Sequence, residues 1–168
     1  MKTVMHLQYT GKREKQYIKE AFALEEPFYG AHVGNGWRYL GQGAYKTVYK
    51  KGNVVVKFAV DHEIWSEVSC YFTAHPYWRR NFARIYGFSR DRIVQKYIPK
   101  FKSTKQQRKE AAEYLLRVEA AMNIDDVYYG HNVRIHGNRA IIFDLGINII
   151  PAKRRKHIPK YLHKVIYK

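Results

Sequence analysis

The stretch Tyr39–Lys57, which reads YLGQGAYKTVYKKGNVVVK, constrains the fold more than any other part of the chain. Residues 37–49 alternate well enough to predict two strands around a pair of glycines. Lys51-Gly52-Asn53 has turn chemistry, and the β-branched run Val54–Val60 predicts a third strand. Strands this close in sequence pair with their neighbours, so the stretch predicts an antiparallel sheet.

The rest of the chain predicts three helices and two further hairpins. Asp61 is a plausible N-cap, and the HEIWSEVSCYFTA that follows has apolar residues at helical spacing until His75-Pro76 ends the pattern. The other expected elements are an amphipathic helix in GKREKQYIKEAFALEE, a hairpin of Phe82–Phe88 and Arg92–Ile98, a helix over Ser103–Met122, and a short hairpin of Asn132–Ile135 and Ala140–Phe143.

Composition restricts the kinds of partner. The 168 residues predict one domain, and a single cysteine excludes an internal disulfide framework. No apolar run is long enough to span a bilayer and no secretory signal is present, so we expect a soluble cytoplasmic protein with no membrane partner. The net charge of +17 favours polyanions or acidic proteins. Seven Lys or Arg and no acid in the tail, residues 151–168, make nucleic-acid binding there possible.

The order of these elements, with the residues they carry, resembles the protein-kinase-like fold over roughly Tyr39–Asn148. The family's glycine-rich loop, G-x-G-x-x-G-x-V, is similar to Gly41, Gly43, Lys46 and Val48, with lysine at the third glycine position. Glycine lets the backbone approach phosphate oxygens, and a lysine beside phosphates is electrostatically reasonable. The plainer alternative is a hairpin whose glycines serve only its turn.

Lys57 corresponds to the lysine that family members carry on the strand after this hairpin. A lysine within an apolar strand is costly unless paired, and the resemblance implies that Lys57 contacts phosphates and pairs with a carboxylate of the next helix. Glu67 is the preferred partner, because EVSCYFTAHP resembles the kinase helix that leads into a His-Pro corner, and Glu63, one helical turn earlier on the same face, is the alternative. An edge-strand lysine reaching solvent is the structural alternative. Gln95 and Tyr97, in a strand similar to the one that enters the family's hinge, are expected beside the nucleotide base.

The stretch IDDVYYGHNVRIHGNRAIIFDLG, residues 124–146, is similar to the catalytic loop and metal-binding segment. The resemblance implies that Asp126 is the catalytic base, with Asp125 as a fallback, and that Asn132 and Asp144 bind Mg²⁺. Five residues rather than four separate Asp126 from Asn132, so His131 is an alternative to the asparagine. These departures resemble the looser loops of aminoglycoside-kinase-like and small phage-encoded kinases.

The resemblance implies an α+β fold with an antiparallel five-stranded N-lobe, one N-lobe helix and a much reduced helical C-lobe, because only 22 residues follow Gly146. We expect an N-terminal extension over 1–36, the N-lobe over 37–98, the reduced C-lobe over 99–150 and the basic tail over 151–168. The implied activity is a minimal ATP- and Mg²⁺-dependent serine/threonine protein kinase. Its catalytic set is Lys57, Glu67 and Asp126, and Lys57 and Asp144 must face one cleft. Two alternatives stay open: a pseudokinase-like regulator that binds a host protein, and a basic nucleic-acid-binding protein.

Overall fold

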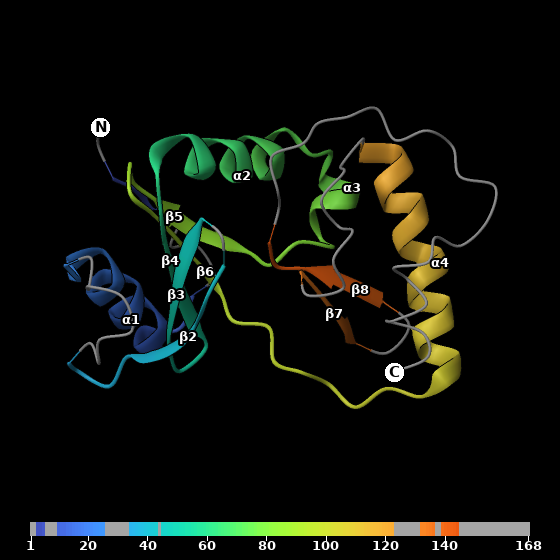
Figure 1. The fold of residues 1–168 in the computed structure, drawn as a ribbon, viewed down its shortest axis with the longest axis horizontal. Helices are drawn as coiled ribbons and strands as arrows, with labels where there is room; N and C mark the ends of the chain where they lie inside the picture. The colour runs from blue at the N-terminus through green and yellow to red at the C-terminus, as the bar shows by residue number, and fades with distance from the viewer. Residues whose placement is uncertain are drawn as a thin grey trace. The chain divides into compact units, whose positions relative to one another are not determined.

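The protein is described here from a computed structural model (Figure 1). The chain divides into two compact units, residues 1–68 with 84–97, and residues 69–83 with 98–168. The structure describes residues 3–5, 10–25, 34–43, 45–122, 132–136 and 139–144.

An antiparallel sheet forms the first unit, with the strand order β1-β5-β6-β4-β3-β2. The α+β class and the antiparallel pairing agree with the prediction. The five strands expected over residues 37–98 are β2 to β6, and a two-residue strand from the N-terminal extension adds to their sheet by pairing with β5. Its strands are β1 (Val4–Met5), β2 (Arg38–Gln42), β3 (Lys46–Lys51), β4 (Val54–Ala59), β5 (Ile85–Phe88) and β6 (Arg92–Lys96).

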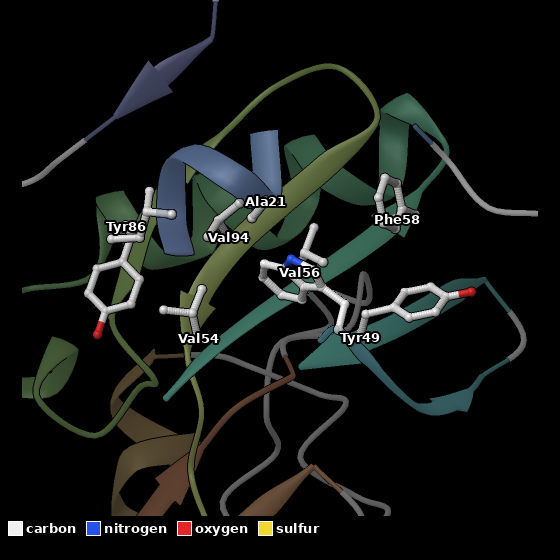
Figure 2. Close-up of a cluster of buried hydrophobic side chains, with 9 residues drawn as sticks. Ala21, Tyr49, Val54, Val56, Phe58, Tyr86 and Val94 are labelled. Carbon is white, nitrogen blue, oxygen red and sulfur yellow. The ribbon is translucent and has the colours of Figure 1, made fainter. Parts of the chain in front are cut away.

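Helix α1 (Lys12–Ala23) covers one face of this sheet, where its Ile18 and Ala21 are fully buried. On β4, Val54, Val56 and Phe58 point to this side, as the two-residue period of a strand requires. Figure 2 shows the cluster beneath the helix. Its buried members are Ile18, Ala21, Trp37, Tyr49, Val54, Val56, Phe58, Tyr86 and Val94.

On the same strand, Val55 and Lys57 point to the opposite face, and both are buried. Helix α2 (Asp61–Thr73) begins two residues after β4, and its Glu67 contacts Lys57 on this side. A strand that is buried on both faces reads as a continuous apolar run, which explains the sequence VVV. We had expected one helix with the sheet. The amphipathic helix predicted in the N-terminal extension is α1, which also packs on the sheet, so this segment contributes to the core of the first unit.

The second unit contains α3 (Pro76–Arg79), α4 (Lys105–Met122) and the hairpin of β7 (Val133–His136) and β8 (Arg139–Ile142). Helix α4 packs against both strands of the hairpin (Figure 1). The segment 81–83 also joins β8, since the Ala83 N–H donates to the Ile142 carbonyl and the Ile142 N–H donates to the Asn81 carbonyl, both at 2.7 Å. The buried apolar residues of this unit include Phe82, Ala111, Ala112, Leu115, Val118, Val133, Ala140 and Ile142.

Candidate functional site

An ion pair between β4 and α2 is the chemical centre of the first unit. The Lys57 ammonium lies 2.7 Å from Glu67 Oε1, and the two residues are 2% and 1% exposed. A carboxylate and an ammonium this deeply buried need each other, because either alone would bear the full cost of leaving water. The predicted partner of Lys57, Glu67, is therefore the one that the structure provides. The catalytic role of the pair stays a prediction.

Glu67 also holds a second lysine. Its Oε2 atom accepts a hydrogen bond from Lys46 Nζ at 2.8 Å, and Lys46 is 9% exposed. One carboxylate thus binds two ammonium groups, one on each oxygen. We call Lys46, Glu67 and Lys57 the lysine–glutamate triad.

Strand register places both lysines on one face of the sheet. Strands β3 and β4 pair residue by residue, with Lys51 opposite Val54, Val48 opposite Lys57 and Lys46 opposite Ala59. Directly opposed residues share a face and so do residues two apart, so Lys46 and Lys57 are diagonal neighbours. The turn at Gly52-Asn53 fixes this register. The turn chemistry and the two-residue strand period are therefore the sequence signal that puts Lys46 on the face of Lys57.

The alternative carboxylate, Glu63, has a different partner. Its Oε1 lies 3.5 Å from Nε2 of His62, which is exposed. Glu63 itself is 4% exposed, one helical turn before Glu67 on α2. The two glutamates share a helix face, as expected, and Lys57 contacts the later one.

The glycine hairpin between β2 and β3 lies next to the triad. The Gly43 N–H donates to the Lys46 carbonyl at 2.9 Å, which closes the end of the hairpin. Gly41 has φ +153° at a register shift in the β2–β3 pairing, a conformation for which glycine is suited. Val48 is partly buried and pairs with Lys57 across the strands. The hairpin is thus tied to the triad through the backbone of Lys46.

The two residues expected beside a nucleotide base lie at the end of β6. Gln95 is 3% exposed and pairs with Val55, which puts it on the face of the sheet that carries Lys57. Tyr97 places its ring under the Lys50 ammonium, 3.7 Å from the centroid. The Tyr97 N–H donates to the Asn53 carbonyl and the Lys96 N–H to the Arg84 carbonyl. Both N–H groups are therefore used in hydrogen bonds within the first unit.

The predicted metal ligands lie in the second unit, at the open end of the β7–β8 hairpin. The Phe143 N–H donates to the Asn132 carbonyl at 2.8 Å, so Asn132 pairs with the residue before Asp144 there. Both residues are partly buried. An amide oxygen and a carboxylate are hard donors of the kind that Mg²⁺ takes, usually together with water and phosphate oxygens. The residues present fit a magnesium site on donor chemistry.

Other predictions for the catalytic segment lie outside the described residues: Asp125, Asp126 and His131, and the basic tail over 151–168. Within the described residues, no group of three or more His, Cys, Asp and Glu side chains could hold a metal ion. The expected cleft shared by Lys57 and Asp144 involves both units, which are described separately, and it stays a prediction. No helix in the described part of the chain has the length and hydropathy needed to cross a membrane.

Comparisons with known proteins add little to this geometry. No protein-family model matches the chain, and no curated protein matches it. Among solved structures, the chain is similar to the structure of the streptomycin–ATP–APH(2")-IIa ternary complex, with 10% sequence identity and a TM-score of 0.41. The match covers 94% of this chain and 84% of the other. A likeness this low assigns no activity, so the function is argued below from contacts within the chain.

Proposed function

We propose that this protein binds ATP with Mg²⁺ and is a minimal kinase-like phosphotransferase. The observation that carries the proposal is the buried Lys57–Glu67 ion pair on the sheet face beside a glycine hairpin. Phosphoryl transfer requires little covalent participation by the protein. It requires a fixed cation on the phosphates that are not transferred, a metal, and a group that orients the attacking hydroxyl.

The first unit supplies the fixed cation. Glu67 accepts from Lys57 through one oxygen and so orients an ammonium that has three donors in all. Gly41 and Gly43 allow the hairpin backbone to approach phosphate oxygens, and Val48 offers an apolar surface for the base. Gln95 and Tyr97 belong to the same proposal as residues beside the base.

The metal-binding part of the proposal rests on Asn132 and Asp144. When bound, Mg²⁺ neutralises charge that develops on the phosphate oxygens. The roles of these two residues are to supply one amide oxygen and one carboxylate from the same hairpin end. Asp126, with Asp125 as its fallback, would accept a hydrogen bond from the acceptor hydroxyl and hold it in line.

The acceptor of the phosphoryl group is the most specific part of the proposal. A Ser or Thr hydroxyl of an acidic protein, or of this protein itself, is supported by the net charge of +17. A nucleotide-binding regulator without transfer is the alternative, since the spacing between Asp126 and Asn132 departs from the family pattern. Binding and transfer therefore have to be measured separately.

The binding experiment is calorimetric titration of the protein with ATP and Mg²⁺. Charge-assisted hydrogen bonds contribute about 1.5–3 kcal/mol, so Lys57→Met should weaken ATP binding roughly 10- to 100-fold. Lys51→Met is the matched control. It also removes a Lys–Glu pair, with Nζ 2.6 Å from Glu20 Oε2, but this pair is partly exposed and lies on the opposite face of the sheet. An equal effect of both variants, or no ATP binding by the wild type, would contradict the proposal.

The transfer experiment follows γ-labelled phosphate onto protein, with mass spectrometry to locate the modified residue. Asp126→Asn and Asp144→Asn should each abolish labelling of the wild-type acceptor. Labelling that survives in both variants would refute the assigned roles. ATP binding without labelling would instead favour the regulator.

A further inference from the structure

Helix α3 exposes aromatic and basic side chains together. None of its four residues is buried, and Tyr77 is 49% exposed. Trp78 is partly buried, and Arg80, the C-cap residue of the helix, is exposed. We infer that Tyr77, Trp78 and Arg80, which we call the aromatic–arginine turn, form a binding surface for single-stranded nucleic acid. This inference goes beyond the proposed phosphotransfer and does not depend on it.

The three side chains of the aromatic–arginine turn contact one another. The Arg80 guanidinium lies 4.2 Å from the centroid of the Tyr77 ring. The Trp78 ring meets the same tyrosine edge to face, with the two centroids 4.7 Å apart and the planes at 85°. A cation over an aromatic face and an edge-to-face pair are both favourable contacts. The turn therefore presents exposed ring surface and positive charge at one place.

Hydrogen bonds to neighbouring residues fix the backbone of the turn. The Tyr77 N–H donates to His75 Nδ1 at 3.2 Å, and the Arg79 N–H donates to the His75 carbonyl at 3.0 Å. The Arg79 guanidinium donates to the carbonyls of Phe72 at 2.7 Å and Ala74 at 2.9 Å, so this arginine ties the turn to the end of α2. A surface that is already ordered loses less conformational entropy when a partner binds.

Charge and ring chemistry together select the kind of partner. Residues 69–83, the segment of the second unit that carries the turn, contain two arginines and no acidic residue, and the whole chain has a net charge of +17. Positive charge attracts phosphates, and an aromatic ring stacks on any base. The bases of a duplex are stacked on each other, so exposed rings favour a single strand.

An acidic protein segment is the alternative partner, because Tyr, Trp and Arg are also enriched at protein–protein interfaces. The two partners differ in what they offer to the tyrosine ring, since a peptide carries carboxylates but no bases. A strand with bases and an abasic strand of the same length carry the same phosphate charge. The difference between their affinities therefore measures the contribution of the bases.

The experiment measures the affinity of the whole chain for labelled oligothymidine and for an abasic oligonucleotide of the same length, by fluorescence anisotropy. The wild type should bind oligothymidine more tightly than the abasic strand. Tyr77→Leu should weaken oligothymidine binding about fivefold or more, as the loss of one stacked base predicts, and leave the abasic strand unaffected. Tyr77→Phe keeps the ring and should bind both strands like the wild type.

Trp65→Leu is the matched control. Trp65 on α2 is an aromatic side chain of similar exposure, 43%, and it lies outside the aromatic–arginine turn. This variant should keep the wild-type affinity for both strands. An effect of Trp65→Leu as large as that of Tyr77→Leu would overturn the inference.

The remaining outcomes also decide the question. Equal affinity of the wild type for the two strands, or equal weakening of both in Tyr77→Leu, overturns base stacking at the turn. Polyglutamate that displaces oligothymidine from the wild type but not from Tyr77→Leu would assign the turn to an acidic protein. If thermal melting shows that Tyr77→Leu does not fold, Arg80→Gln tests the same surface. It should lower the slope of log affinity against log salt by about 0.7 for either strand, and an unchanged slope would contradict the inference.

Discussion

Arg92 shows how one side chain can hold a helix on a sheet. Its guanidinium donates to the carbonyls of Ala21 at 3.1 Å and Phe22 at 3.4 Å, and it also donates to the carbonyl of Leu24. These groups end α1, where the last carbonyls have no partner within the helix and a cation is favourable. Asp91 accepts from the same guanidinium and from the Ser89 hydroxyl. Arg92 is thus fixed by a neighbouring carboxylate while it caps α1.

The hydrogen bond from Arg92 lowers the pKa of the Asp91 carboxyl to about 2, against a smaller opposing effect of burial. An aspartate in an unfolded chain titrates near about 3.9. The folded state therefore gains stability from this group above that pH, and loses it as the pH falls through the folded pKa. The gain is at most about 1 kcal/mol, because the Asp91 side chain is 41% exposed and solvent screens it.

Urea unfolding at pH 6 and pH 2.5 checks this prediction. Asp91→Asn should be less stable than the wild type at pH 6, and the difference should shrink at pH 2.5. A difference that stays constant over this range would show that Asp91 does not titrate as described.

The lysine–glutamate triad was only partly predictable from the sequence. Lys57 was identified because a lysine inside an apolar strand requires a partner, and Glu67 because it follows on the next helix. The contact of Lys46 with Glu67 was missed. A side chain's face depends on strand register, and the spacing of a glycine pattern alone does not give register.

The β3–β4 hairpin depends on one glycine. Gly52 has φ +57°, in the left-handed region, and a Cβ atom there would lie 2.5 Å from Cε2 of Tyr17. Tyr17 belongs to α1 and packs against the core cluster. The turn is therefore restricted twice, by its backbone conformation and by the helix above it.

Gly52→Ala should lower the free energy of unfolding by about 1–3 kcal/mol, from the left-handed backbone together with the displaced Tyr17 ring. Chemical denaturation measures the change. Combining it with Tyr17→Ala isolates the steric part in a double-mutant cycle. Gly34→Ala is the control, since a Cβ at Gly34 meets nothing within 4 Å. Equal stability of Gly52→Ala and wild type would contradict the clash.

Elements with a strong local signal were predicted well. Helix α4 and the β3–β4 hairpin follow from apolar spacing and turn chemistry, and their boundaries differ from the prediction by only a few residues. The two-residue strand β1 and the four-residue helix α3 were missed, because neither is long enough to show a period. The role of α1 was also missed. Its amphipathic pattern predicts a helix, but not the sheet face that it covers.

The whole molecule carries a net charge of +17, and this charge predicts salt-dependent binding to polyanions. The tail residues 151–168 were expected to make this contact. Replacing four of the tail's basic residues by Gln should reduce the slope of log affinity for single-stranded DNA against log salt by about 3. The tail variant changes Lys153, Arg154, Arg155 and Lys156.

A matched variant changes four exposed basic residues of α1, namely Lys12, Arg13, Lys15 and Lys19. Gel shifts over a range of salt concentrations should leave its slope closer to the wild-type value than that of the tail variant. The reverse order would place the contact on α1. A wild-type affinity that does not change with salt would remove the polyanion hypothesis.

For the molecule as a whole, the α+β class and the antiparallel sheet were predictable, because turn residues and β-branched runs indicate which neighbouring strands pair. The division of the chain between the two units was not. The expected domains followed the chain in order, whereas residues 69–83 belong to the second compact unit and residues 84–97 return to the first. Contacts between distant segments decide such a division, and a single sequence does not contain them.

The alternation of β4 also bears on which changes of length the gene can tolerate. Val54, Val56 and Phe58 lie under α1, while Val55 and Lys57 lie on the side of Glu67. Deleting one codon inside this strand would exchange the two sets. The lysine would then lie in the hydrophobic core under α1, and a valine or phenylalanine would lie beside the Glu67 carboxylate. We therefore expect insertions and deletions among relatives to accumulate in the connecting loops and to spare β4.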